Sequence, residues 1–329
     1  MIKKIAIVGI GSIGSRHLRL VHELLPRCEV VIVRSGNGTR SEKKNITEES
    51  FDSLQDAIDA GIQAAVISTP SAFHIDQMIM VMKAGIHVLV EKPLSNSIKN
   101  INTLLDIHQE SKAIGLIGYC LRYDPAAVQF KEMLNEKKIG KILHVNIDCG
   151  SYLPDWRPGQ DYRQSASAIK KLGGGVLLEL SHELDYIRWF FGEVENVMAK
   201  LGNSSTLDID VEDSAEILLH SMQGFNIGVH LDFNSRTDRR TCKARCTEGD
   251  LIWDAISKTV TWVPSGGSEE VKKFQYGCDY IYREQLRHFF DCIENGQQPK
   301  VTVEDGIATL RIVEGIRKSS TMGKRMDVE

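Results

Sequence analysis

The stretch Ile5-Ala-Ile-Val-Gly-Ile-Gly-Ser-Ile-Gly14 decides the fold, because a short apolar run passes directly into closely spaced glycines. Ser15–Leu25 follows with the apolar spacing of a helix. Gly9 permits a tight turn, Gly11 lets the backbone approach a pyrophosphate, and Gly14 lets the helix pack closely on the strand. The free N–H groups at the start of such a helix bind phosphate. The loop residues predicted to bind a dinucleotide are Gly9, Gly11, Ser12, Ile13 and Gly14.

Strand and helix patterns alternate from this motif to about residue 122. Strands alternating with helices predict a parallel, doubly wound sheet, the Rossmann arrangement. The strand-like runs are Ile5–Val8, Glu29–Val33, Ala64–Ser68, His87–Val90 and Ile114–Tyr119, and helical runs include Ser53–Ala60 and His74–Ala84.

The rhythm changes near residue 122, where a helix over Asp124–Asn135 is followed by several β-rich runs. Runs of strands predict an open, mostly antiparallel sheet. We therefore expect an α/β chain with a Rossmann domain over 1–122 and a substrate-binding and oligomerisation domain over 123–329. The runs are Ile142–Cys149, Val197–Leu201, Ala215–His220, Asn226–Phe233, Thr241–Cys246 and Thr259–Val263, and helices Asp279–Asn295 and Val303–Ser320 close the chain.

Composition excludes several classes of protein. The chain has 329 residues, and its formal net charge of -4 gives no basic footprint for nucleic acid. We find neither the longer apolar core of a signal peptide nor an apolar window long enough for a transmembrane helix, so we expect a cytoplasmic protein. Seven scattered cysteines indicate reduced thiols. Cys242 and Cys246 lack a second pair, so no metal site is expected.

The end of the second predicted strand bears on the choice of cofactor. NAD sites usually carry an acid here that binds the ribose 2′-hydroxyl, but Val31–Val33 continues into Arg34 and Ser35. Arg34 can bind a 2′-phosphate through two hydrogen bonds, and Ser35 can donate another. This favours NADP over NAD. The alternative is that Arg34 stacks on the adenine and accepts either cofactor.

A lysine follows the fourth strand, where His87–Val90 continues into Glu91-Lys92-Pro93. Ligands of open α/β sheets lie beyond the carboxyl ends of the strands. Lys92 can therefore reach both nicotinamide and substrate, and can donate a proton or a hydrogen bond to the reacting oxygen. The alternative is an ordinary surface lysine.

A second candidate site follows the three glycines at 173–175. On a continuous helix, Glu179, His182 and Asp185 would lie near one face. His182 is the natural general acid or base, since its unperturbed pKa is about 6.5, and either acid can orient it. The alternatives are a buried core histidine and acids that cap the helix or form ordinary ion pairs.

The segment Tyr152–Arg163 is aromatic, contains arginine and has no regular period. Aromatic faces pack on sugar rings, and arginines bind carboxylates or phosphates, so we predict a substrate loop; a packing or interface loop is the alternative. Tyr119 is expected either in the floor of the active site or in the core, and His17 in packing. The predicted substrate contacts are Lys92, Tyr119, Trp156, Arg157, Tyr162, Arg163 and His182.

The chain resembles the glucose-fructose oxidoreductase, inositol dehydrogenase and rhizopine catabolism (Gfo/Idh/MocA) family. The similarity spans nearly the whole chain, in family order. The motifs that carry it are the 9–14 glycine loop, Ser68-Thr-Pro70 with His74, Glu91-Lys92-Pro93, Gly118-Tyr-Cys-Leu-Arg122-Tyr-Asp-Pro125, Gly173-Gly-Gly175 with His182 and Asp185, and Glu304-Asp-Gly306.

The resemblance implies hydride transfer at a sugar or polyol carbon, with Lys92 as the catalytic lysine. It implies that Thr69, Pro70 and His74, with neighbouring Ser68, lie on the nicotinamide side. By the same resemblance Glu91 contacts the cofactor ribose, and Arg122 is the arginine that follows the fifth strand near the cofactor. One departure concerns the acid before His182: the family usually has an Asp four residues earlier, whereas Glu179 lies three residues earlier.

We therefore expect an NAD(P)-dependent oxidoreductase that acts on a sugar, polyol or nucleotide sugar, assembled as a homodimer or homotetramer through its open sheet. Two alternatives remain. An NAD-dependent glycosidase would oxidise its substrate transiently and leave no reduced cofactor. A non-catalytic cofactor sensor would need neither Lys92 nor His182.

Overall fold

The computed structural model describes residues 2–34 and 48–328, and its internal contacts divide the chain into two compact units. The first unit comprises residues 1–120 and 278–307. The second comprises residues 121–277 and 308–329. The segment 278–307 thus joins the first unit although it follows most of the second in the chain, and the division into domains 1–122 and 123–329 stays a prediction.

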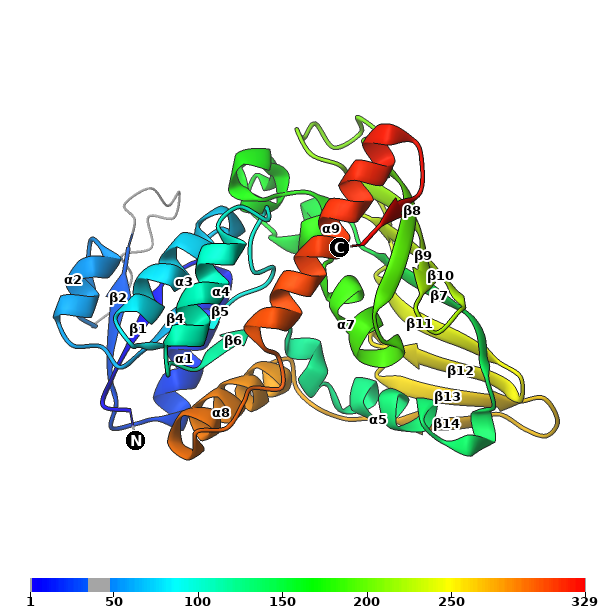
Figure 1. Cartoon of the computed structure of the whole chain (residues 1–329), viewed down its shortest axis with the longest axis horizontal. Helices are drawn as coiled ribbons and strands as arrows, with labels where there is room; N and C mark the ends of the chain where they lie inside the picture. The colour runs from blue at the N-terminus through cyan, green and yellow to red at the C-terminus, as the bar shows by residue number, and fades with distance from the viewer. Residues whose placement is uncertain (1, 35–47, 329) are drawn as a thin grey trace. The chain divides into compact units, whose positions relative to one another are not determined.

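A parallel sheet forms the first unit, with six strands among the described residues in the order β3-β2-β1-β4-β5-β6. This confirms the predicted doubly wound fold. Figure 1 labels β2, β1, β4, β5 and β6 of this sheet. The order reverses between β1 and β4, and the carboxyl ends of strands at such a switch point form the ligand crevice of open α/β sheets. The strands are β1 Lys4–Val8, β2 Glu29–Val33, β3 Ser50–Phe51, β4 Ala64–Ile67, β5 His87–Val90 and β6 Gly115–Ile117.

Helices cover this sheet and bury its apolar strands. Ile5 and Leu89, from two of the strands, share one buried cluster with Leu20 of α1 and with Leu286 and Phe289 of α8. Helices α3 and α4 pack against each other (Figure 1). The elements are α1 Ser12–Leu24, α2 Leu54–Asp59, the 3-10 helix η1 Ser71–Phe73, α3 His74–Lys83, α4 Ile101–Glu110, α8 Tyr280–Asn295 and α9 Val303–Met322, which continues into the second unit.

The second unit is built on a large sheet, with nine strands among residues 121–277 and 308–328 in the order β14-β13-β12-β11-β7-β10-β9-β8-β15. Only β7 and β10 pair in parallel there, so the predicted open, mostly antiparallel sheet is confirmed. The strands are β7 Ile142–Gly150, β8 Val194–Gly202, β9 Ser214–Ser221, β10 Asn226–Asp232, β11 Arg239–Cys246, β12 Gly249–Asp254, β13 Thr259–Pro264, β14 Glu270–Lys273 and β15 Met326–Asp327.

Helices cover one face of this second sheet through an aromatic cluster. The rings of Phe130 and Phe190 lie 5.0 Å apart between centroids, and Tyr186 lies 5.2 Å from Trp253 of β12. No helix in the described part of the chain is long and apolar enough to span a membrane. The elements are η2 Cys120–Tyr123, α5 Pro125–Leu134, η3 Lys137–Ile139, η4 Leu153–Trp156, η5 Tyr162–Gln164, η6 Ala166–Ala168, η7 Lys170–Leu172, α6 Val176–Glu179 and α7 His182–Phe191.

One local prediction is wrong: residues 179, 182 and 185 do not lie on a single helix. Helix α6 ends at Glu179 and α7 begins at His182. The backbone of Leu180 turns to φ -98° and ψ 30°, and the Ser181 N–H donates to the carbonyl of Leu178, three residues back. A helix needs bonds four residues back. The break removes the regular spacing on which the alignment of Glu179 with His182 depended.

Candidate functional site

The glycine loop passes from β1 into α1 and packs on the residue after β4. Gly9 has φ +86°, a conformation that favours glycine, and its N–H donates to the carbonyl of Val33. The hydroxyl of Ser68 donates to the carbonyl of Gly9 at 2.7 Å. Ser68, predicted as a contact on the nicotinamide side, therefore holds the glycine turn through its hydroxyl.

Different constraints account for glycine at positions 11 and 14. A Cβ on Gly14 would lie 2.0 Å from the carbonyl oxygen of Gly9, so the packing of helix on strand requires glycine there. A Cβ on Gly11 would meet nothing within 4 Å, and its φ of -70° suits any residue. Nothing in the described protein requires glycine at 11, whereas a pyrophosphate approaching the backbone does. The first turn of α1 also carries no acidic residue, which leaves its N-terminus suited to an anion. These residues fit a dinucleotide.

Arg34 follows β2 directly. Its N–H donates to the carbonyl of Phe51, which anchors the backbone at the edge of the sheet. Its side-chain Nε is buried and has no hydrogen-bond partner among residues 2–34 and 48–328. Ser35, predicted as a second contact to the 2′-phosphate, lies outside the described residues.

The Ser68-Thr-Pro70 segment and His74 lie at the carboxyl end of β4. The hydroxyl of Thr69 donates to the side-chain oxygen of Gln77 at 2.6 Å. Pro70 precedes η1, and His74 begins α3. His74 is buried, with Nε2 2.7 Å from the carbonyl oxygen of Thr69 and Nδ1 2.9 Å from that of Pro93. Its ring therefore joins the segments that follow β4 and β5.

Glu91, Lys92 and Pro93 follow β5, and the Lys92–Pro93 peptide is cis. Glu91 is buried, and its Oε1 lies 2.7 Å from Nε2 of His17, which is fully buried on α1. Burial raises the pKa of Glu91, but the His17 contact and the Lys92 charge outweigh it and hold that pKa below its ordinary value. The interpretation of His17 as packing missed this contact. Its only sequence signal is its position three residues after Gly14.

The second unit places His182 at the first position of α7, 8% exposed. The same turn carries two buried acids. Glu183 accepts from Nε of Arg240 on β11 at 2.8 Å. Asp185 accepts two bonds from Arg122, at 2.7 and 3.0 Å. Arg122 thus lies in a buried ion pair on η2. Sequence patterns gave no signal for Glu183 or Arg240.

Packing explains two of the three glycines before α6. A Cβ on Gly174 would lie 2.6 Å from the carbonyl oxygen of Ala166, and one on Gly175 would lie 2.4 Å from Oε1 of Glu212. That carboxylate accepts a long bond from the N–H of Leu177 in the first turn of α6. Glu179, at the last position of α6, is half-buried. The glycines therefore let two other segments approach α6 closely.

The predicted substrate contacts fall into two environments. Tyr119 is fully buried in the first unit. In the second unit, the Trp156 indole donates to Ser151 at 2.7 Å, and the Tyr162 hydroxyl donates to the carbonyl of Leu207 at 2.7 Å. Arg157 is half-buried, whereas Arg163 is exposed and paired with Asp161 at 2.9 Å. Two short 3-10 helices, η4 and η5, order this segment.

Family models match both parts of the chain. The model of an oxidoreductase family with an NAD-binding Rossmann fold matches residues 3–119, and the GFO/IDH/MocA C-terminal domain matches residues 127–252. The Rossmann fold, its glycine loop and the family match therefore define an NAD-binding oxidoreductase. The chain belongs to the Gfo/Idh/MocA family, as the motifs predicted.

Relatives and solved structures extend the similarity over the full length. The inositol 2-dehydrogenase of Salmonella typhimurium is 26% identical over 100% of this chain and 97% of its own. The scyllo-inositol 2-dehydrogenase (NAD(+)) of Bacillus subtilis is 27% identical over 98% and 95%. A levoglucosan dehydrogenase in complex with NADH shares the fold, with a TM-score of 0.87, 19% identity and 99% of each chain covered.

Proposed function

We propose that the chain transfers hydride between a nicotinamide cofactor and a hydroxyl or keto carbon of a sugar, polyol or nucleotide sugar. One observation carries this proposal: the carboxyl ends of strands in a single parallel sheet bear both the glycine loop, after β1, and Lys92, after β5. Gly11, which the protein's own packing does not require, supports the cofactor half. The two relatives compared above are named as inositol dehydrogenases, which supports the polyol half.

The chemistry divides between cofactor and side chains. Nicotinamide supplies a carbon that accepts or gives the hydride. In the oxidising direction the substrate loses a hydride from carbon and a proton from oxygen. In this proposal Lys92 donates a hydrogen bond to that oxygen and His182 accepts the proton. Glu179 or Asp185 orients His182. Asp185 supports His182 through α7, which the Arg122 pair holds.

Further contacts complete the proposal. We propose that Glu91 binds the ribose of the cofactor, and that the Ser68–Pro70 segment and His74 lie against its nicotinamide. We assign the substrate to Tyr119, Trp156, Arg157, Tyr162 and Arg163. The Trp156 and Tyr162 rings are held by bonds to Ser151 and Leu207, which orients their faces. Arg163 is exposed and paired with Asp161, so a substrate carboxylate or phosphate has to compete with that pair. A cytoplasmic location stays a prediction of the sequence.

A substrate screen tests the reaction class. Purified protein is mixed with NAD or NADP and with free sugars, uronates, inositols and nucleotide sugars, while absorbance at the reduced-nicotinamide band is followed. We expect reduced cofactor to accumulate with one substrate class, with an equal amount of keto product. Bond cleavage without a net change in absorbance would instead indicate transient oxidation. Cofactor binding without any turnover would favour a sensor.

We propose further that NADP is the preferred cofactor. No acid follows Val33 in the sequence up to Gly38, and Arg34 has a buried Nε without a partner in the described part of the chain. A 2′-phosphate would satisfy such a guanidinium. The test is calorimetry with NADPH and NADH. Arg34→Ala is expected to weaken NADPH more than NADH, and wild-type protein that binds NADH at least as tightly contradicts the proposal.

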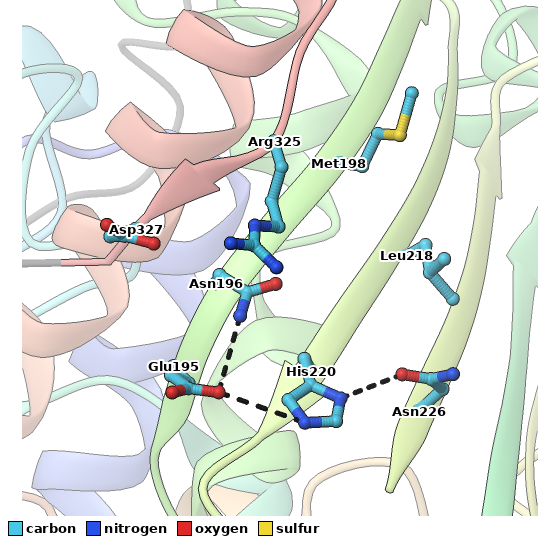
Figure 2. Close-up of a pocket in the computed structure, with 8 residues that line it drawn as sticks. All are labelled: Glu195, Asn196, Met198, Leu218, His220, Asn226, Arg325 and Asp327. Carbon is cyan, nitrogen blue, oxygen red and sulfur yellow. Dashed lines mark hydrogen bonds and ion pairs between the residues drawn. The ribbon is translucent and has the colours of Figure 1, made fainter. Parts of the chain in front are cut away.

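We also propose that the uncovered face of the second sheet joins copies of this chain. Met198 and Leu218 are neighbours across β8 and β9, and they are 53% and 48% exposed. Figure 2 shows them in a pocket beside His220. Nδ1 of His220 lies 2.9 Å from Oδ1 of Asn226, and its Nε2 lies 3.8 Å from Oε2 of Glu195. Apolar side chains rimmed by polar groups are typical of a protein interface.

Light scattering after size exclusion tests this surface. We expect Leu218→Asp to shift the wild-type dimer or tetramer toward the monomer. Met222→Asp, at an exposed residue just past the end of β9, is the matched control. A monomeric wild type, or an assembly that survives Leu218→Asp, contradicts the proposal.

A further inference from the structure

The two neighbours of Lys92 in the chain each contact a different buried histidine. The carboxylate of Glu91 accepts a hydrogen bond from His17 of α1, and the carbonyl of Pro93 lies within hydrogen-bond distance of His74 of α3. We propose that His17 and His74, here called the histidine clamp, are positioning residues that fix the backbone on both sides of Lys92 and thereby aim its side chain. The inference rests on the proposed role of Lys92 in the reaction.

His17 acts through the carboxylate of Glu91. An ionised carboxylate only accepts, so Nε2 of His17 carries the hydrogen and donates to Oε1. The other oxygen, Oε2, accepts from the N–H of Lys92 at 3.2 Å. Gly118 on the neighbouring segment leaves room for this arrangement, because a Cβ there would lie 2.9 Å from Cα of Glu91 and 3.0 Å from N of Lys92. The carboxylate therefore joins α1 to the backbone of the lysine.

His74 acts on the far side through the Pro93 carbonyl. Its other ring nitrogen faces the carbonyl of Thr69 after β4. Carbonyl oxygens only accept, so a neutral ring donates to one of the two and only a protonated ring donates to both. In either form the ring lies between the segments that follow β4 and β5. It fixes Pro93 relative to the nicotinamide-side segment.

Both histidines are polar groups in places that an apolar side chain could fill. His17 is 0% exposed and His74 is 1% exposed. Burying a polar group is unfavourable unless it makes hydrogen bonds, so hydrophobic packing does not explain these residues. What they share is a bond to a residue adjacent to Lys92. A misplacement of about 1 Å at a reacting group can lower a rate about 10²-fold.

The test compares His17→Leu and His74→Leu with a control on the same strand. His87 lies at the opposite end of β5, where its Nδ1 accepts the Ile114 N–H, so His87→Leu removes a similar contact far from Lys92. Lysines are dimethylated with ¹³C-formaldehyde, and the Lys92 resonance is assigned with Lys92→Arg. We expect this resonance to move in both clamp variants and to stay unchanged in His87→Leu. An unchanged resonance in both clamp variants overturns the proposal without any need for a substrate.

Kinetics on the substrate found by the screen provides the second readout, well below each variant's Tm. We expect kcat at saturating cofactor to fall about 10²-fold in each clamp variant, with partial recovery in His17→Gln, which keeps a donor for Glu91. Equal loss of kcat in His87→Leu overturns the proposal. Lys92→Met is measured in parallel. Full activity there defeats the proposed role of Lys92, whereas inactivity there with fully active clamp variants defeats the clamp alone.

Discussion

Lys92 and His182 are supported by different kinds of contact. Around Lys92 the supports are histidines that bond a carboxylate and backbone carbonyls within a parallel sheet. Around His182 they are two ion pairs, in which Asp185 and Glu183 on α7 meet arginines from elsewhere in the second unit; the Asp185 pair is buried and the Glu183 pair is partly buried. The acids also lie in the first turn of α7, where the helix dipole favours negative charge.

The difference shows two ways to fix a reactive side chain. At a strand end, neighbouring segments already lie close together, so one bond from a histidine to the backbone suffices. A helix lying on a sheet has no such backbone within reach, and long charged side chains make the connection instead. Loss of one partner from a buried ion pair leaves an uncompensated charge, so the second unit should be the more sensitive to single substitutions.

Breaking the Arg122–Asp185 pair should have the largest effect. Arg122→Met leaves the nearly fully buried carboxylate of Asp185 without two donors, and we expect the free energy of unfolding to fall by about 3–5 kcal/mol. Urea unfolding measures it. Arg122→Met with Asp185→Leu should recover part of this loss, since the double variant buries no unpaired charge. A loss below about 1 kcal/mol would remove the contrast between the units.

The glycine loop should separate folding from binding. In Gly14→Ala the new Cβ meets the Gly9 carbonyl, so we expect overpacking to reduce the free energy of unfolding by about 1–3 kcal/mol. In Gly11→Ala we expect stability to change by less than about 0.5 kcal/mol while dinucleotide affinity falls at least about tenfold. Thermal unfolding and calorimetry provide the two values. Unchanged affinity in Gly11→Ala would contradict the phosphate assignment.

Burial of His74 should make the stability of the first unit depend on pH. Burial lowers the pKa of His74 below its ordinary 6.5, while the two carbonyls and the Glu91 charge act to raise it and the Lys92 charge to lower it. Between the folded and unfolded pKa values the unfolded chain binds more protons, so stability falls as pH falls below about 6.5. His74→Phe should flatten this dependence of urea unfolding between pH 5 and 7. An equal slope in wild type and variant would exclude His74 as its source.

The exposed Arg163–Asp161 pair should matter least to stability. Both side chains are accessible, so water and salt screen their attraction and the pair adds little to the free energy of unfolding. Arg163→Met should therefore unfold at nearly the wild-type urea concentration. A decrease in the free energy of unfolding near that of Arg122→Met would mean that burial does not determine how much an ion pair stabilises this protein.

Sequence patterns predicted most of the fold because its strands are apolar runs that end at glycines or polar residues. The predicted bounds of β2 and β5 agree with the structure. The short strand β3 was missed because two residues show no period, and β14 because all four of its residues are exposed. The break between α6 and α7 was missed because Leu180 and Ser181 carry no breaker signal.

Site residues that belong to a sequence motif could be predicted. Residues that contact them from distant parts of the chain could not. Glycines and Lys92 follow strands, so their positions follow from the fold. Arg240 lies 57 residues from Glu183, and nothing local in either segment signals the pair. The bond between His17 and Glu91 spans 74 residues, and a histidine on an apolar helix face looks like packing until the partner strand is placed.

A double-mutant cycle in kcat tests most directly whether Lys92 and His182 serve one step. Wild type, Lys92→Met, His182→Gln and the double variant are compared on the substrate found by the screen, with cofactor Kd measured for all four. Each single change should lower kcat by roughly 10²–10⁴-fold with little change in cofactor Kd. The double variant should lose less than the product of the two, because residues that act as a unit are not additive. Full activity in Lys92→Met, or a loss explained entirely by weaker cofactor binding, would contradict the account.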